Sequence, residues 1–241
     1  MLHKTRGIVF SFTEYRETSL IVKIYTELFG LQTYIVNGVR KKNSRQHSAV
    51  FQPLTPVELV VYHKDKPGIQ RLSEIRPSPP LHDLPFNVIK STITLFLSEV
   101  IGKSVREEEG NPLLFEFLHN SILQLDLDEK PSPDFHQLFL IRLTKYIGFF
   151  PVQNFSNENC YFSLSEGKFQ SSIPLHPYYL NEKHSENFSK LIQLSSLFSS
   201  STGFSSDEKK TLLENILEYY RLHIEGFGTV KSHKVLEQVF E

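Results

Sequence analysis

The sequence of 241 residues contains one cysteine, one methionine and no tryptophan. Its lone cysteine, Cys160, cannot form a disulfide within the chain, and one thiolate alone cannot make a cysteine zinc site. We therefore expect a protein of a reducing compartment that folds without a disulfide framework. The 20 phenylalanines and 10 tyrosines are sufficient for a sizeable hydrophobic core.

Long apolar runs are also missing. No segment approaches the roughly 18 apolar residues that span a bilayer. The chain begins MLHKTR, which lacks the apolar region of a signal peptide. These absences predict a cytoplasmic protein without membrane attachment.

Motifs of the common enzyme classes are absent as well. The sequence contains no GxSxG, no Walker loop, no GxGxxG and no pair of histidines at the spacing of HExxH. We therefore predict no catalytic residues, no metal site and no cofactor. A protein that binds partners without turnover is the favoured class.

The net charge of −1 conceals an uneven distribution of charge. Residues 1–80 hold 12 basic and 6 acidic side chains, a net of +6, whereas residues 81–241 hold 14 basic and 21 acidic side chains, a net of −7. A basic N-terminal part favours an anionic partner. The alternative is ordinary scatter of charge in a soluble protein.

Alternating apolar residues predict five short strands in the first eighty residues. The predicted strands lie at about residues 8–12, 20–25, 31–36, 57–62 and 69–75. This number matches an OB-fold barrel, although an SH3-like barrel has a similar one. We expect an α+β protein in which a five-stranded OB-fold barrel over residues 1–80 precedes a mostly helical domain over residues 81–241.

Helical periodicity begins after the proline-rich residues 77–80. Helices are predicted at about residues 85–102, 112–125, 133–148, from 185, from the capping box of Ser205 and Glu208, and at 232–240. The third of these helices is apolar nearly all round, which predicts a buried central helix. Residues 150–185 lack a sustained period and predict an irregular insertion with a small hairpin around Gly167.

A basic hairpin is the main candidate site of the barrel. Between the third and fourth predicted strands, four basic residues fall within six positions: Arg40, Lys41, Lys42 and Arg45. Their charge suits phosphate, and the alternative is a solvated loop. Aromatic residues of the barrel that could stack on bases, most of them expected in the core, are Tyr15, Tyr25, Phe29, Tyr34, Phe51 and Tyr62.

Lys231 stands at the start of the last predicted helix. A cation there opposes the helix dipole unless an anion binds at the same place. This position predicts a second phosphate contact, against the alternative of simple surface charge.

Several motifs resemble the RecO family of bacterial recombination mediators. The N-terminal ones are KTRGIV at residues 4–9, Tyr15-x-Glu17-x-Ser19, Thr26-x-x-x-Gly30 and Gly38-x-Arg40. Further along, Ile147-Gly148-Phe149 and Lys231-Ser232 are similar to the family's helix end and C-terminal signature. The resemblance covers most of the chain and is most specific in its N-terminal third.

The resemblance implies a DNA-binding protein without enzymatic turnover. Family members bind single- and double-stranded DNA, anneal complementary strands and dock on the C-terminal tail of single-stranded DNA-binding protein. They also work with RecR to load RecA recombinase, which implies a place at the nucleoid. A non-catalytic protein-interaction scaffold built on an OB-like barrel is the alternative function.

Basic residues are the expected contacts of both kinds of partner. The residues expected at DNA phosphates are Arg6, Arg16, Lys23, Arg40, Lys41, Lys42, Arg45 and Lys231. The family places its tail-docking site on the helical domain, and the basic residues of the third predicted helix are Arg142 and Lys145.

The chain departs from many relatives at the zinc module. Cys160 stands where the first of four cysteines would be, and serines, prolines and His176 occupy the rest of that region. Zinc is therefore not expected. We predict that apolar side chains hold the segment together instead, namely Tyr161, Phe162, Leu164, Phe169 and Ile173.

Overall fold

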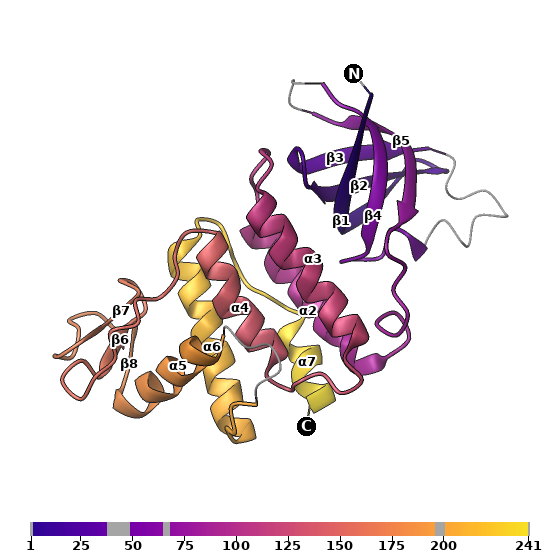
Figure 1. Ribbon diagram of the computed structural model, residues 1–241. Coiled ribbons are helices and arrows are strands. Elements are labelled where there is room, and N and C mark those ends of the chain that lie inside the picture. Colours follow the sequence, from indigo (N-terminus) through magenta and orange to yellow (C-terminus); the bar gives the residue numbers. More distant parts are fainter. Residues whose placement is uncertain (1, 38–48, 65–67, 196–200, 241) are drawn as a thin grey trace. The chain divides into compact units, whose positions relative to one another are not determined.

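The computed structural model describes residues 2–37, 49–64, 68–195 and 201–240 (Figure 1). The chain divides into two compact units, Met1–Glu129 and Lys130–Glu241. Among the described residues, the first unit contains a closed β-barrel and the helices α2 and α3, and the second contains helices and one small sheet. The predicted α+β class, with an N-terminal OB-like barrel before a helical region, is confirmed.

Five strands close the barrel in the order β1-β2-β3-β5-β4. Their bounds are β1 Leu2–Tyr15, β2 Ser19–Thr26, β3 Gly30–Val36, β4 Pro56–Tyr62 and β5 Gln70–Pro77, close to the predicted ranges. Neighbouring strands are antiparallel except β3 and β5, which pair in parallel with Ile35 opposite Arg71. The closed order leaves an inner face for the core and an outer face for partners.

The interior of the barrel is tightly packed around Gly7. A Cβ atom on Gly7 would lie 2.7 Å from the Cγ2 atom of Ile24 and 2.9 Å from the Cδ1 atom of Leu59. Both of these side chains are buried in the core cluster of the barrel. The glycine of the KTRGIV motif is therefore required by space inside the barrel.

Helices α2 (Val88–Ser104) and α3 (Pro112–Leu127) follow the barrel in the first unit. The side chain of Asn87 caps α2, and that of Asn111 caps α3 by accepting a hydrogen bond from the backbone N–H of Leu114 at 3.1 Å. The Asn-Pro signal for α3 is thus confirmed. The predicted start of α2 at residue 85 was early, because the cap lies at Asn87.

The helices and the barrel belong to one compact unit. The ring of Tyr25 on β2 stacks between Phe10 on β1, at 5.6 Å, and Phe115 on α3, at 6.5 Å. A Cβ on Gly30 would lie 2.5 Å from the backbone oxygen of Glu107, so the α2–α3 connection packs directly on the β2–β3 turn. The change from strands to helices near residue 80 therefore lies within a unit that extends to Glu129.

The second unit is built around a buried helix. Its helices are α4 (Phe135–Tyr146), α5 (Glu182–Leu194), α6 (Ser206–His223) and α7 (His233–Phe240). Every residue of α4 from Phe135 to Ile141 is buried, which confirms the burial expected from its apolar sequence. The predicted capping box of Ser205 and Glu208 is also present at the start of α6.

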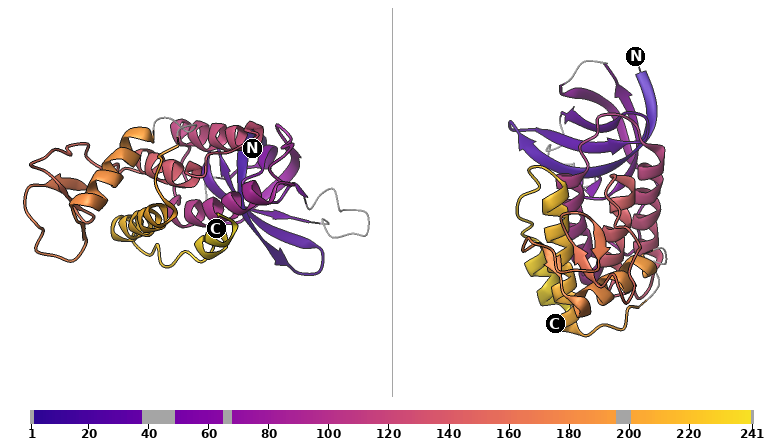
Figure 2. Two further views of the ribbon diagram at one scale, coloured as in Figure 1. Left: turned by 90° about the horizontal axis from the view of Figure 1, so that it is seen from below. Right: turned by 90° about the vertical axis from the view of Figure 1, so that its left-hand side faces the viewer.

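A small sheet in the order β7-β6-β8 occupies the irregular region. Its strands are β6 (Tyr161–Ser163), β7 (Lys168–Gln170) and β8 (Tyr179–Leu180), and the predicted hairpin turns at Gly167. The sheet lies beside α5 in both figures, where the hydroxyl of Ser185 accepts a hydrogen bond from the N–H of Phe162 at 2.8 Å (Figures 1 and 2).

Aromatic and aliphatic side chains fill the inner side of this sheet. Phe162, Leu164 and Phe169 are at most 4% exposed. Tyr161 is partly buried and donates a hydrogen bond from its hydroxyl to Glu182 at 2.6 Å. The expectation for Ile173 was wrong: its side chain is 56% exposed, because it lies in the loop beyond β7.

Candidate nucleic-acid interface

Of the predicted DNA-binding residues, Arg16 lies at one end of the barrel, on the turn between β1 and β2. Arg40, Lys41, Lys42 and Arg45 lie outside the described residues. Asn37 marks where their segment begins, and its side-chain oxygen accepts a hydrogen bond from the hydroxyl of Ser19 at 2.9 Å. The β1–β2 turn, which carries Arg16, therefore lies beside the start of the basic segment.

Arg16 presents its charge next to an aromatic ring. Its backbone is left-handed, with φ of 54°, and its guanidinium carbon lies 5.1 Å from the centre of the Tyr15 ring. A guanidinium over a ring at this distance is a cation–π contact. The turn thus offers a cation and a partly exposed aromatic face together.

Lys23 on β2 and Arg71 on β5 lie on the outer face of the barrel, with β3 between their two strands. Lys23 on β2 is opposite Thr33 on β3, and Ile35, two residues further along β3, is opposite Arg71 on β5. Residues directly opposite one another, and residues two apart in one strand, share a face of the sheet. Both cations are exposed, and within the part of the chain that the structure describes neither is ion-paired with a carboxylate.

Arg71 was missed in the sequence analysis. Its signal was present but weak, because it is a single basic residue at an outward position of a strand that follows the Lys66-Pro67-Gly68 turn. Only the parallel pairing of β3 with β5 places it on the same face as Lys23.

Arg6, in contrast, is neutralised by carboxylates. Its guanidinium lies 2.6 Å from Glu27, is hydrogen-bonded to Glu116 on α3, and sits 5.0 Å from the centre of the Phe115 ring. The hydrogen bonds to the two carboxylates raise the pKa of Arg6, and the bond from Arg6 lowers the pKa of Glu27. A DNA phosphate would have to compete with these two carboxylates, so the role of Arg6 at DNA stays a prediction.

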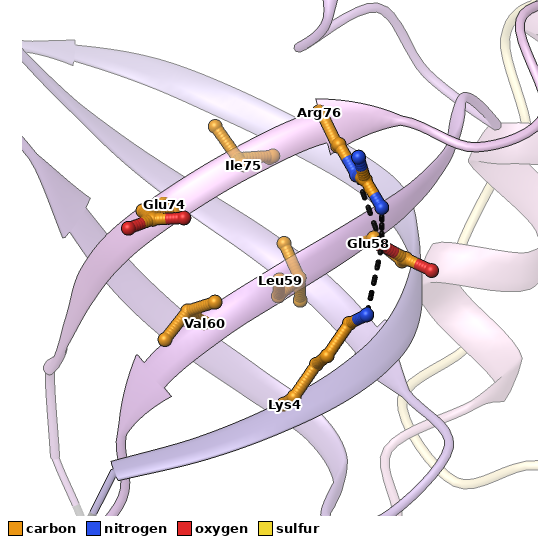
Figure 3. A pocket seen from close by; sticks show the side chains of 7 residues that line it. All are labelled: Lys4, Glu58, Leu59, Val60, Glu74, Ile75 and Arg76. Carbon is orange, nitrogen blue, oxygen red and sulfur yellow. Dashed lines mark hydrogen bonds and ion pairs between the residues drawn. The ribbon is translucent and has the colours of Figure 1, made fainter.

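A cavity of about 350 Å³ lies on the outer face of the barrel across β1, β4 and β5 (Figure 3). Lys4 and Arg76 both point at Glu58: the Lys4 ammonium lies 3.4 Å from its carboxylate, and the Arg76 Nε donates to it at 2.9 Å. The hydrogen bond from Arg76 lowers the pKa of Glu58. Because these charges satisfy one another, this cavity attracts a polyanion less than Lys23 and Arg71 do.

The remaining predicted site residues belong to the second unit. Lys231 is exposed and lies two positions before the first residue of α7. Arg142 and Lys145 lie three positions apart on α4, so they share one side of that helix. Arg142 is half-buried and Lys145 is exposed. Their roles at DNA and at a protein tail stay predictions.

In the region around Cys160, the histidine that could have been a metal ligand is hydrogen-bonded to serine hydroxyls. The Nε2 atom of His176 lies 3.0 Å from the hydroxyl of Ser165 and 3.3 Å from that of Ser163. Across the described ranges, no three His, Cys, Asp or Glu side chains gather in a way that would hold a metal ion. Over the same ranges, no helix combines the length and apolarity needed to cross a bilayer.

Comparison with known proteins gives one consistent family. The family models described as Recombination protein O N terminal and Recombination protein O C terminal match residues 1–80 and 85–233. A DNA repair protein RecO from Flavobacterium psychrophilum is 39% identical over 240 residues, which are 98% of each chain. Proteins of the same name from Azobacteroides pseudotrichonymphae and Bacteroides fragilis are 35% and 34% identical over the full length of both chains.

Proposed function

This chain belongs to the RecO family of DNA repair proteins, and from that premise we propose that it is a recombination mediator that binds DNA and performs no catalytic turnover. It binds single- and double-stranded DNA, anneals complementary strands and helps to load RecA on strands coated by single-stranded DNA-binding protein. Its place is the nucleoid in the cytoplasm.

The observation that supports DNA binding is the distribution of paired and unpaired cations on the barrel. Lys23 and Arg71 share an outer face without a carboxylate partner among the described residues, and Arg16 lies on the turn at the same end. Unpaired cations attract phosphates of any sequence, and such binding weakens as salt rises. A mediator needs this property, because it must hold strands and then release the annealed product.

Partner docking is assigned to the second unit. We place the acidic, apolar tail of single-stranded DNA-binding protein against Arg142 and Lys145, because two cations on one side of α4 suit carboxylates. RecR is the second protein partner. RecA is an indirect partner, because it is loaded on strands that single-stranded DNA-binding protein had coated.

The salt dependence of DNA binding tests this proposal. If about four phosphates of single-stranded DNA are neutralised, a plot of log affinity against log salt has a slope of about −3. Replacing Arg40, Lys41 and Lys42 with alanine, or Lys23 alone, should make the slope shallower, by about 0.7 for each phosphate that is no longer neutralised. Fluorescence anisotropy with a labelled oligonucleotide over a range of salt concentrations measures the slope.

Arg76→Ala is the matched control, because Arg76 is a barrel arginine already held by Glu58. We expect it to leave the slope unchanged. A slope that responds to Arg76→Ala and not to Lys23→Ala would show that DNA binds at the cavity beside Glu58 and not at Lys23. No affinity for oligonucleotides even at low salt would refute the DNA-binding function itself.

A strand-annealing assay tests the mediator function. Complementary oligonucleotides should anneal faster with the protein than without it, including when single-stranded DNA-binding protein coats them. If Arg142→Ala and Lys145→Ala leave the annealing of coated strands intact, the proposed tail site is wrong. Lys190→Ala is a suitable control, since this exposed lysine of α5 is paired with Glu186 at 2.8 Å.

A further inference from the structure

We propose that Tyr62 and Arg71 form a site on the outer face of β4 and β5 where the base of a single-stranded nucleotide stacks. The inference rests on the proposed DNA-binding function and specifies the form of DNA that this face prefers. In this site the ring of Tyr62 contacts the base, and the guanidinium of Arg71 contacts the phosphate.

The pairing of the strands places the two side chains side by side. Tyr62 is directly opposite Arg71 in the antiparallel pair of β4 and β5, and it is opposite Leu2 on β1. Side chains directly opposite each other share a face, with Cβ atoms about 5 Å apart. Tyr62 is 46% exposed and Leu2 is 54% exposed, so the ring borders solvent and an apolar neighbour.

Tyr62 is distinguished from the other aromatic residues of the barrel by what surrounds it. Tyr25, Tyr34 and Phe51 are at most 1% exposed and belong to the core. Phe29 stacks on His63 at 3.8 Å, and the Tyr15 ring carries the guanidinium of Arg16. Within the described residues, Tyr62 stacks on no other ring and Arg71 is bound to no carboxylate.

The same outer face continues from Tyr62 toward Lys23. Ile35 on β3 is opposite both Arg71 on β5 and Ile21 on β2, and Lys23 lies two residues beyond Ile21 on the same face of β2. The isoleucines are half-buried and separate the two cations. A single strand of DNA that crosses β4, β5, β3 and β2 would therefore meet a ring, a cation, an apolar stretch and a second cation.

This arrangement favours single strands for a physical reason. The faces of bases are covered by their neighbours in a duplex but can be splayed out in a single strand, where aromatic rings and guanidinium planes stack on them. Phosphate contacts alone would not distinguish the two forms in this way. The Tyr62–Arg71 pair therefore adds preference for single strands to the attraction supplied by the other cations.

The test compares an oligo-dT, an oligomer of abasic sites of the same length, and a duplex, each bound to the full chain. We expect the wild type to bind oligo-dT more tightly than the abasic oligomer. Tyr62→Ala should weaken binding of oligo-dT by about 5-fold or more while leaving the abasic oligomer unchanged, because only base stacking is removed. Tyr62→Phe keeps the ring and should retain wild-type affinity.

Arg71→Ala should weaken binding of both single-stranded oligomers and make the salt slope shallower by about 0.7. Phe86→Ala is the control, because Phe86 is an aromatic residue of the same unit that is 82% exposed and precedes α2. It should change neither affinity. Tyr62→Thr, which retains strand propensity, replaces Tyr62→Ala if thermal unfolding shows that the alanine variant does not fold.

Equal affinity of the wild type for oligo-dT and the abasic oligomer would overturn the inference and leave DNA binding standing. So would a Tyr62→Ala variant that weakens both oligomers equally, or neither. Failure of the wild type to bind any oligonucleotide at low salt is a different result, and it would refute the proposed function instead.

Discussion

Burial changes the acid–base behaviour of one histidine strongly. His136 on α4 is 5% exposed, and loss of solvation, reinforced by the charge of Lys209 and opposed by that of Asp134, lowers its pKa to about 4. Asp134 is fully buried and accepts hydrogen bonds from the N–H of Thr202 at 2.8 Å and its hydroxyl at 2.9 Å. The neutral imidazole thus belongs to the folded state.

The free energy of unfolding should therefore decrease as the pH decreases through a defined window. In the unfolded chain the imidazole takes up a proton below its ordinary pKa of 6.5, whereas in the folded chain it does so only below about 4. The unfolded state binds more protons between these values, so the contribution of neutral His136 is complete above pH 6.5 and is lost as pH falls toward 4.

Urea unfolding of the wild type and of His136→Gln at pH 7 and pH 5 measures this effect. We expect the free energy of unfolding to decrease less in the variant than in the wild type over this interval. An equal decrease in both proteins would contradict the assignment.

The sequence alone could not single out His136 among ten histidines, because its burial depends on helices that pack around α4.

Among the secondary-structure elements, the sheet of β6, β7 and β8 depends on aromatic packing. The ring of Phe162 on β6 lies 4.8 Å from that of Phe169 on β7, 4.6 Å from Phe188 on α5 and 5.9 Å from Tyr219 on α6. One side chain thus joins two strands to two helices. The packing occupies the region where the resemblance to the family would place zinc ligands.

Truncation of this ring should destabilise the second unit. Phe162→Ala is expected to lower the free energy of unfolding by about 3–5 kcal/mol, because a large buried side chain is removed and a cavity remains. Leu175→Ala, at a fully exposed position of the same segment, should change it by less than about 0.5 kcal/mol. Chemical unfolding of the two variants provides the comparison.

A chelator should leave the thermal unfolding temperature of the wild type unchanged, because hydrophobic contacts need no metal. A decrease in that temperature with chelator, together with one zinc per chain by elemental analysis, would show that a metal stabilises this segment.

The hairpin at Gly167 was predictable from local turn residues. Its partners Phe188 and Tyr219 were not, since they come from helices later in the chain.

For the chain as a whole, the barrel and the first two helices form one unit of packing. The backbone N–H of Leu31 on β3 donates to the carbonyl of Glu107 at 2.7 Å, and Tyr25 stacks on Phe115 of α3. Arg6 on β1 is hydrogen-bonded to Glu116 of the same helix. Removing the helices would expose the ring of Tyr25 and leave Arg6 with one carboxylate.

A fragment of residues 1–129 should therefore unfold cooperatively, with a free energy of unfolding higher than that of a fragment of residues 1–80. The shorter fragment lacks the aromatic stack and the carboxylate of Glu116. Circular dichroism during urea titration compares the two. If the fragment of residues 1–80 proves as stable as the longer one, α2 and α3 do not contribute to the stability of the barrel.

Local and periodic features could be predicted from the sequence because they depend on near neighbours along the chain. Strand alternation indicated the five strands of the barrel, and the Asn111-Pro112 pair indicated the start of α3. The anionic partner that the uneven charge suggests stays a prediction. The family could also be inferred from motifs, since these keep their order and spacing.

The tertiary structure decided which of those residues remain available for binding. Arg6 meets Glu116, which is 110 positions away, and Tyr62 meets Arg71 only through the pairing of β4 with β5. A periodic pattern specifies the face of a strand but not the distant side chain that will neutralise a charge or cover a ring. For this reason the sequence did not show which barrel cations are paired, whereas the fold holds Arg6 and Arg76 against carboxylates and gives Lys23 no carboxylate partner among the described residues.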